Sequence, residues 1–217
     1  MENCVRRPEK SVAKFKSYGR PPGQLQKNFA ATLAAKLPDH AKGKPLEIWF
    51  QDEARIGQQG TLTRVWAKRG TRPRAPRDQR YEWAYIFGAV CPQRGATAAL
   101  VAPTANTEVM SMHLKEIGGN VAPGAHAALV LDGAGYHLAA GLAVPDNITL
   151  VHQPPYAPEL NPVENVWEYL RGNKLSNTIY ENYDDILEKA CQAWMFFAND
   201  KERVTSITTR QWAKVNL

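Results

Sequence analysis

The fold is decided by the stretch Leu129-Val-Leu-Asp132-Gly-Ala-Gly-Tyr-His137, in which three apolar residues lead directly into an aspartate. The apolar run predicts a buried strand, and Gly133 and Gly135 mark the point where that strand ends. Asp132 is therefore expected at the carboxyl edge of a strand. Such a carboxylate is either a solvated turn residue, because Asp-Gly is a common turn signal, or a ligand for a metal or a substrate.

Two further acids occur in comparable places. Leu46-Glu-Ile-Trp-Phe-Gln-Asp52-Glu-Ala-Arg55 is again a strand-like run that leads into an aspartate, and we expect Asp52 at a strand end. Glu164 lies in Asn161-Pro-Val-Glu164-Asn-Val-Trp167, which predicts the start of a helix with Asn161 as its N-cap and Pro162 as its first residue. Glu164 falls where a capping-box residue belongs, so it is either a helix cap or a ligand beside the two aspartates.

Three segments carry a resemblance to a known family. They are Trp49-Phe-Gln-Asp52-Glu, Leu131-Asp132-Gly-Ala-Gly-Tyr-His137 and Pro155-Tyr-Ala-Pro-Glu-Leu-Asn-Pro-Val-Glu164-Asn-Val-Trp167. They resemble the three catalytic blocks of the mariner-like DDE transposases, in the branch carried by bacterial insertion sequences. The resemblance runs from about residue 45 to the C-terminus, and the third block is its most specific part.

The resemblance implies an RNase H-like fold and cut-and-paste DNA transposition, with cleavage at the ends of a mobile element, strand transfer and TA targets. It makes Asp52, Asp132 and Glu164 the catalytic residues and implies DNA as a partner and a homodimer on DNA. Family members place helix-turn-helix units before the catalytic domain, and this chain lacks room for them. A separate helix-turn-helix chain, a split reading frame or a truncated copy are the explanations we consider.

The three acids also define the expected cofactor. Carboxylates held close together repel one another unless a cation lies between them, and a site made only of oxygen ligands favours Mg²⁺ or Mn²⁺. Two such ions serve an in-line phosphoryl displacement. Neither the cysteines (Cys4, Cys91, Cys191) nor the histidines show zinc-type spacing.

Four neighbours of these acids are weaker candidates. Strand alternation places Glu53 on the opposite face from Asp52, so we prefer Asp52 as the ligand. Glu168, one helical turn after Glu164, is either an outer group that supports the site or a solvated surface acid. Arg55 and His137 each follow a catalytic aspartate by a few residues, and each either reaches phosphate, orders the outer groups that support the ligands, or lies on the surface.

Positive charge is concentrated in two places. Residues 1–44 contain ten lysines and arginines against three acids, and residues 64–80 contain seven against one. A basic arm and a basic insertion on an acidic body are typical of contact with a phosphate backbone, although an ordinary solvated loop has the same composition. The DNA-binding candidates in the insertion are Arg64, Lys68, Arg69, Arg72, Arg74, Arg77 and Arg80.

The order of the predicted elements gives an α/β fold. A basic arm and linker over 1–44 carries one helix marked by Leu25, Phe29, Leu33 and Leu37, and the RNase H-like domain occupies 45–217. Strands are expected at 46–52, about 62–67, 82–90 and 96–101, and, after a helix at 106–117, at 127–132 and 148–152, with a helical piece at 135–142 between them. We therefore predict a mixed five-stranded sheet of three antiparallel and two parallel strands, flanked by helices.

Other features limit the alternatives. A hydrophobic content of 44% is enough for a real core, and we find neither a signal peptide nor a membrane-spanning run, so we expect a cytoplasmic, nucleoid-associated protein. Two other functions are kept open. One is a structure-selective RNase H-like nuclease, and the other is a catalytically silent, transposase-derived DNA-binding protein.

Overall fold

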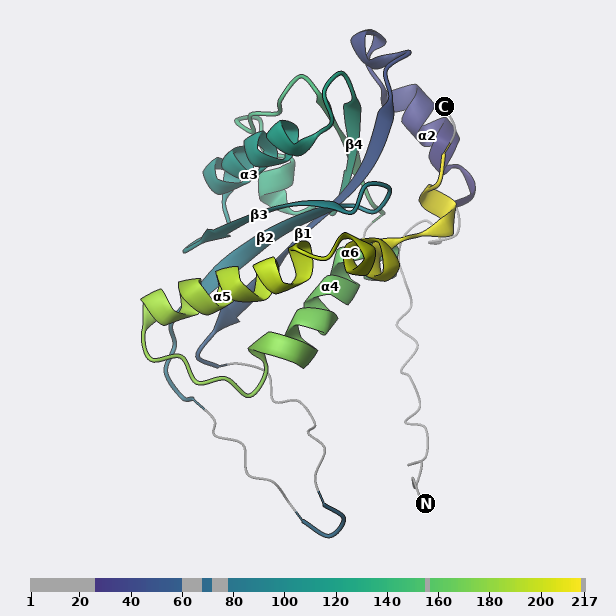
Figure 1. The fold of residues 1–217 in the computed structure, drawn as a ribbon. Helices are drawn as coiled ribbons and strands as arrows, with labels where there is room; N and C mark the ends of the chain where they lie inside the picture. The colour runs from purple at the N-terminus through teal and green to yellow at the C-terminus, as the bar shows by residue number, and fades with distance from the viewer. Residues whose placement is uncertain (1–25, 60–67, 72–77, 155–156, 216–217) are drawn as a thin grey trace.

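The computed structural model describes residues 26–59, 68–71, 78–154 and 157–215, and Figure 1 shows their arrangement. A five-stranded sheet forms the centre, with strand order β3-β2-β1-β4-β5. Its strands are β1 (Leu46–Gly57), β2 (Trp83–Cys91), β3 (Ala96–Ala102), β4 (His126–Leu131) and β5 (Ile148–His152). The predicted mixed sheet of three antiparallel and two parallel strands is confirmed. The strand expected at about 62–67 lies outside the described residues.

The strand β1 joins the two halves of the sheet. It pairs in parallel with β4 only as far as Phe50, opposite Val130, whereas its antiparallel pairing with β2 continues to Gly57. The prediction that Asp52 ends a strand is therefore wrong. Polar residues broke the apolar pattern after Asp52, but hydrogen bonding to β2 keeps the backbone extended for five more residues.

Helices cover both faces of the sheet (Figure 1). The helix α3 (Thr107–Asn120) packs on one face, and α2 (Phe29–Lys36), α4 (Val163–Leu170), α5 (Tyr183–Ala198) and α6 (Lys201–Thr208) lie on the other. Alternation along β1 sends Ile48 and Phe50 toward the α4 side and Trp49 toward α3. Because Asp52 follows Phe50 by two residues, it shares the α4 side.

The predicted helices form with small shifts. In α2, the expected positions Phe29 and Leu33 are fully buried against the sheet domain, which confirms that this helix packs on it. The helical piece expected at 135–142 is only a short 3₁₀ turn over Gly135–His137. No helix in the described parts of the chain is both long and apolar enough to cross a bilayer.

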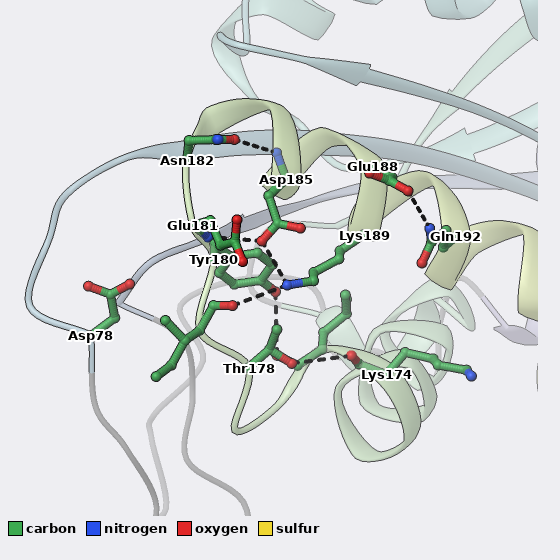
Figure 2. Close-up of polar contacts among 12 residues, drawn as sticks. Asp78, Lys174, Thr178, Tyr180, Glu181, Asn182, Asp185, Glu188, Lys189 and Gln192 are labelled. Carbon is green, nitrogen blue, oxygen red and sulfur yellow. Dashed lines mark hydrogen bonds and ion pairs between the residues drawn. The ribbon is translucent and has the colours of Figure 1, made fainter.

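The start of α5 is held by local polar contacts, drawn in Figure 2. The Asn182 side chain accepts the backbone N–H of Asp185 at 2.9 Å, which caps the helix. Lys189 in the next turn forms an ion pair with Asp185 at 2.7 Å and donates to the carbonyl of Ile179. These contacts fix the segment that precedes α5, to which the basic insertion is attached.

Candidate active site

The three predicted acids line one cleft of about 410 Å³. Asp52 comes from β1, Asp132 directly follows β4, and Glu164 lies in the first turn of α4. The rest of the lining comes from the loops after β4 and β5: Gly133, Ala134, Gln153, Pro154, Ala157, Pro158 and Asn161. Segments far apart in the sequence thus meet at the end of the β1–β4 parallel pair.

Asp52 is half-buried, and a hydrogen bond holds its side chain in place. The indole Nε1 of Trp167 donates to Asp52 Oδ2 at 2.8 Å. Burial raises the pKa of Asp52 to about 7, and the negative charge of Glu164 adds to this rise, while the bond from Trp167 opposes it. At neutral pH this carboxyl group therefore lacks the countercharge that would keep it fully ionised.

The first turn of α4 is tied directly to β1 through Asn161. Its Nδ2 donates to the backbone carbonyl of Gln51 at 2.8 Å, and its Oδ1 accepts the N–H of Val163 at 3.1 Å. The helix begins at Val163, one residue later than predicted, because Pro162 occupies the N-cap position. Asn161 is buried, so its two bonds satisfy a costly polar group and set the position of Glu164 relative to Asp52.

The predicted capping box does not form. The backbone N–H of Asn161 donates to the carbonyl of Pro158 instead of to the Glu164 side chain. Within the described part of the chain, the Glu164 carboxylate has no hydrogen-bond or ion-pair partner, and it faces the cleft. The Glu164 side chain therefore does not cap the helix.

Asp132 combines the two roles that the sequence left open. Its Oδ1 accepts the backbone N–H of Ala134 at 2.9 Å, as a turn aspartate does, and also accepts a bond from His137 Nδ1 at 2.8 Å. The bond from His137 is the main cause that lowers the pKa of Asp132. Asp132 therefore stays ionised at neutral pH and still lines the cleft.

A second polar group lies on the α3 side of the sheet and contains Glu53. Glu53 accepts hydrogen bonds from Gln51 Nε2, at 2.9 Å, and from the Tyr136 hydroxyl, and His137 Nε2 lies 3.8 Å from Glu53 Oε2. Glu53, Asp132 and His137 each place one ligand atom within 4.8 Å of the others. Among the described residues this group, and not the predicted triad, meets that spacing. The opposite-face placement predicted for Glu53 agrees with these partners.

Two of the weaker candidates lie away from the cleft. The guanidinium of Arg55 lies 5.2 Å from the centre of the Trp83 ring and lines a neighbouring cavity of about 270 Å³. Glu168 is exposed on α4 and does not line the cleft. His137, in contrast, is buried and bonded to Asp132, so it is not a surface residue.

The basic insertion is described only in part. Lys68 and Arg69 are exposed, and Arg64, Arg72, Arg74 and Arg77 lie outside the described residues. Arg80 is engaged in holding the chain together. Its guanidinium forms an ion pair with Asp78 at 2.7 Å and donates to the carbonyls of Tyr180 and Glu181, which attaches the end of the insertion to the segment before α5.

Sequence comparison assigns a family. Residues 47–187, well over half of the chain, match the model of the DDE superfamily endonucleases. A protein of Sinorhizobium fredii (strain NBRC 101917 / NGR234), called uncharacterized protein y4pE/y4sA, is 55% identical over 131 residues, which are 60% of this chain and 97% of that protein.

Solved structures give the same fold. The catalytic domain of Mos1 mariner transposase is 15% identical, with a TM-score of 0.55, over 85% of this chain and 83% of that one. The Mos1 transposase paired-end complex with the left transposon end is 16% identical, with a TM-score of 0.60, over 94% of this chain. This chain spans 62% of the length of the Mos1 chain in that complex. The protein therefore belongs to the DDE superfamily of endonucleases, with the RNase H-like fold of a mariner transposase catalytic domain.

Proposed function

We propose that this chain is a transposase catalytic domain that cleaves DNA and transfers the cut strand, with divalent cations held by Asp52, Asp132 and Glu164. The observation that carries the proposal is the cleft of about 410 Å³ that these three carboxylates share in a DDE-family chain. Each acid comes from a different element, so the fold itself, and not a local turn, brings them together.

The residues of the cleft fit a divalent cation. The three acids supply only oxygen ligands, which suits Mg²⁺ or Mn²⁺, and Glu164 has no competing partner in the described part of the chain. The pKa of about 7 for Asp52 is the mark of a buried carboxylate near another acid without a counterion, and a cation supplies that counterion. Mos1 complexes have been solved with Mn and with Mg, which supports the same choice here.

Bound cations, two in our proposal, supply activation of the attacking oxygen and stabilisation of the leaving oxygen in an in-line displacement at phosphorus. The chain supplies orientation. Trp167 fixes one oxygen of Asp52, and His137 with the Ala134 amide fixes one oxygen of Asp132. In each aspartate the second oxygen is then left for the cleft, and Asn161 fixes the helix that carries Glu164.

DNA is the proposed partner. The solved Mos1 complexes include a paired-end complex and a strand transfer complex, and the exposed Lys68 and Arg69 give this chain positive charge in the same insertion as the other basic candidates. A homodimer on DNA and a separate helix-turn-helix chain that reads the element ends complete the proposal.

Nicking of supercoiled plasmid in Mn²⁺ or Mg²⁺ tests the proposal. We expect nicking by the parent chain, and its loss in Asp132→Asn and Glu164→Gln, because each removes a charged ligand without changing the shape of the side chain. Glu168→Gln is the matched control, since it alters an exposed acid of the same helix outside the cleft.

Three outcomes oppose the proposal. If Asp132→Asn still nicks DNA, the cleft is not the source of the nicking. DNA binding by every variant with no nicking by the parent would favour the catalytically silent DNA-binding protein instead. Cleavage of an RNA·DNA hybrid without strand transfer would favour the structure-selective nuclease.

A further inference from the structure

Gln153 lines the cleft that the three acids share, but it is not one of the proposed cation ligands. It directly follows β5, and its backbone N–H donates to the carbonyl of Leu131 at 2.8 Å. Because Leu131 directly precedes Asp132, this bond fixes Gln153 beside that aspartate. Val151, two residues earlier, is buried on the α4 side of the sheet, and strand alternation gives Gln153 the same side.

The side-chain amide of Gln153 is enclosed but makes no hydrogen bond. The residue is 7% exposed, and its Nε2, which carries two N–H donors, is buried without an acceptor among the described residues. A buried amide is costly unless it is hydrogen-bonded, and most buried amides in folded proteins are. The backbone has little freedom to relieve this cost, because a residue that precedes a proline, here Pro154, is held extended. Gln153 therefore has an unpaired donor at the wall of the cleft.

We propose that Gln153 contacts the substrate, and that its Nε2 donates a hydrogen bond to a non-bridging oxygen of the phosphodiester bound in the cleft. This inference rests on the function proposed above, because it needs a DNA strand in the cleft. The torsion about the last bond of a glutamine side chain is broad, so rotation of the amide turns an N–H group toward the cleft without movement of the backbone. The phosphate then supplies the acceptor that the described residues lack.

The strand order places Gln153 next to the acids but not between them. The strand β4 lies between β1 and β5, so Asp132 has Asp52 on one side and Gln153 on the other. Neighbouring strands are about 4.8 Å apart. Cations held by Asp52, Asp132 and Glu164 therefore lie toward β1, which leaves Gln153 to contact the phosphate from the β5 side.

A neutral donor suits this position better than a charged side chain. A lysine or arginine beside Asp132 would pair with the carboxylate and compete with a cation for it, whereas another acid would repel the phosphate. An amide donates to an anion without changing the charge of the cleft. Donors that are fixed where negative charge develops during a reaction stabilise its transition state. Gln153 therefore contributes to the rate of cleavage as well as to binding.

Nuclear magnetic resonance of the side-chain amide in the full chain tests the contact directly. The Gln153 resonances are assigned by their loss in Gln153→Met, which keeps the length of the side chain and removes both donors. We expect a short DNA duplex with Mg²⁺ to shift one of the two amide protons downfield, as a hydrogen bond to an anion does, and Mg²⁺ alone to shift it much less. The amide of Gln192, bonded to Glu188 on α5 (Figure 2), is the internal control and should not respond.

Single-turnover nicking of the same duplex measures the consequence for the reaction. Gln153→Met should lower the nicking rate by roughly 10²-fold, which is the loss typical of one donor removed from a site of developing negative charge. The affinity for Mn²⁺ in a calorimetric titration should stay close to that of the parent, which shows that the cleft is intact. Gln192→Met is the matched control, because it alters an exposed glutamine outside the cleft, and it should nick at the parent rate.

These measurements separate the contact from the proposed function. If the parent chain does not nick DNA but the duplex shifts the Gln153 resonance, the cleavage proposal fails and the contact stands. If the parent nicks but the duplex leaves the resonance in place, or if Gln153→Met nicks at the parent rate, the contact is refuted and the cleavage proposal stands. A full shift with Mg²⁺ alone, or loss of Mn²⁺ binding in Gln153→Met, would make the amide a cation ligand and would also overturn the inference.

Discussion

In the cation-free protein, replacement of Asp52 by asparagine should raise the free energy of unfolding above that of the parent. This gain should be larger at alkaline pH than at acidic pH. Burial and the charge of Glu164 raise the pKa of Asp52 from 3.8 in the unfolded chain to about 7 in the folded one. The folded state therefore binds more protons between these two values, and the parent loses stability as the pH rises through this window. Asparagine has nearly the same shape and never ionises, so it removes this loss.

The magnitude follows from the two pKa values. Linkage gives a destabilisation of about 1.7 kcal/mol at pH 5 and about 4.3 kcal/mol at pH 8, a difference of about 2.6 kcal/mol. Asp52 is only half-buried, and solvent screening reduces such figures, so we expect Asp52→Asn to gain roughly 1 to 2 kcal/mol over the parent between these pH values. Changes in packing cancel in this difference, because they are nearly the same at both pH values.

Urea denaturation without divalent cations, at pH 5 and pH 8, measures this difference. Glu168→Gln is the control, because it neutralises an exposed carboxylate and should change the free energy of unfolding equally at both pH values. Added Mn²⁺ at pH 8 should stabilise the parent much more than Asp52→Asn. An Asp52→Asn effect that is the same at both pH values, or larger at pH 5, would refute the argument that an uncompensated carboxylate is buried here.

Three further changes act on the same cleft through its supports. Gly88 pairs with Asp52 across β1 and β2, and an added Cβ would lie 2.6 Å from the Trp194 ring and 2.8 Å from the Trp167 ring. Gly88→Ala should therefore lower the free energy of unfolding by about 1 to 3 kcal/mol in urea denaturation, and it should also weaken Mn²⁺ binding. Trp167→Phe removes the donor to Asp52 and should lower Mn²⁺ affinity at pH 7 by about tenfold in calorimetry, while Trp194→Phe, which alters the adjacent ring without touching Asp52, should leave that affinity nearly unchanged. Asn161→Ala breaks the buried bonds to β1 and to the start of α4 and should lower the free energy of unfolding by about 2 kcal/mol; unchanged stability would contradict that role.

The sequence predicted the parts of this molecule that depend on short, strong local patterns. The apolar run before Asp132 is a buried strand, and the order of strand-like and helix-like segments predicted the mixed sheet of three antiparallel and two parallel strands. The extension of β1 to Gly57 was not predictable in the same way. The polar residues Glu53 and Arg55 interrupt the apolar run after Asp52, and pairing with β2, a contact distant in the sequence, keeps this segment extended.

The residues that hold the three acids in place were harder to predict from the sequence than the acids themselves. Trp167 belongs to the third sequence block, but its bond to Asp52 exists only because α4 packs on that side of the sheet. Strand alternation places Glu53 on the opposite face from Asp52, so Glu53 was not predicted as a ligand, and the structure agrees that it does not line the cleft. The available signal for its own group was the histidine five residues after Asp132, and nothing local in the sequence connects that histidine to β1.

Adjacent acids on opposite faces of β1 make this protein unusually sensitive to insertions and deletions in that strand. Loss of one residue before Asp52 would turn Glu53 toward the cleft and Asp52 toward His137, because side chains alternate with a period of two. A substitution in this strand alters one side chain and leaves the others on their own faces of the sheet. A change of length by one residue would instead reverse the facing of both acids at once, so deletion of one residue before Asp52 should disrupt both clusters, whereas deletion of two residues should restore the facing of the side chains.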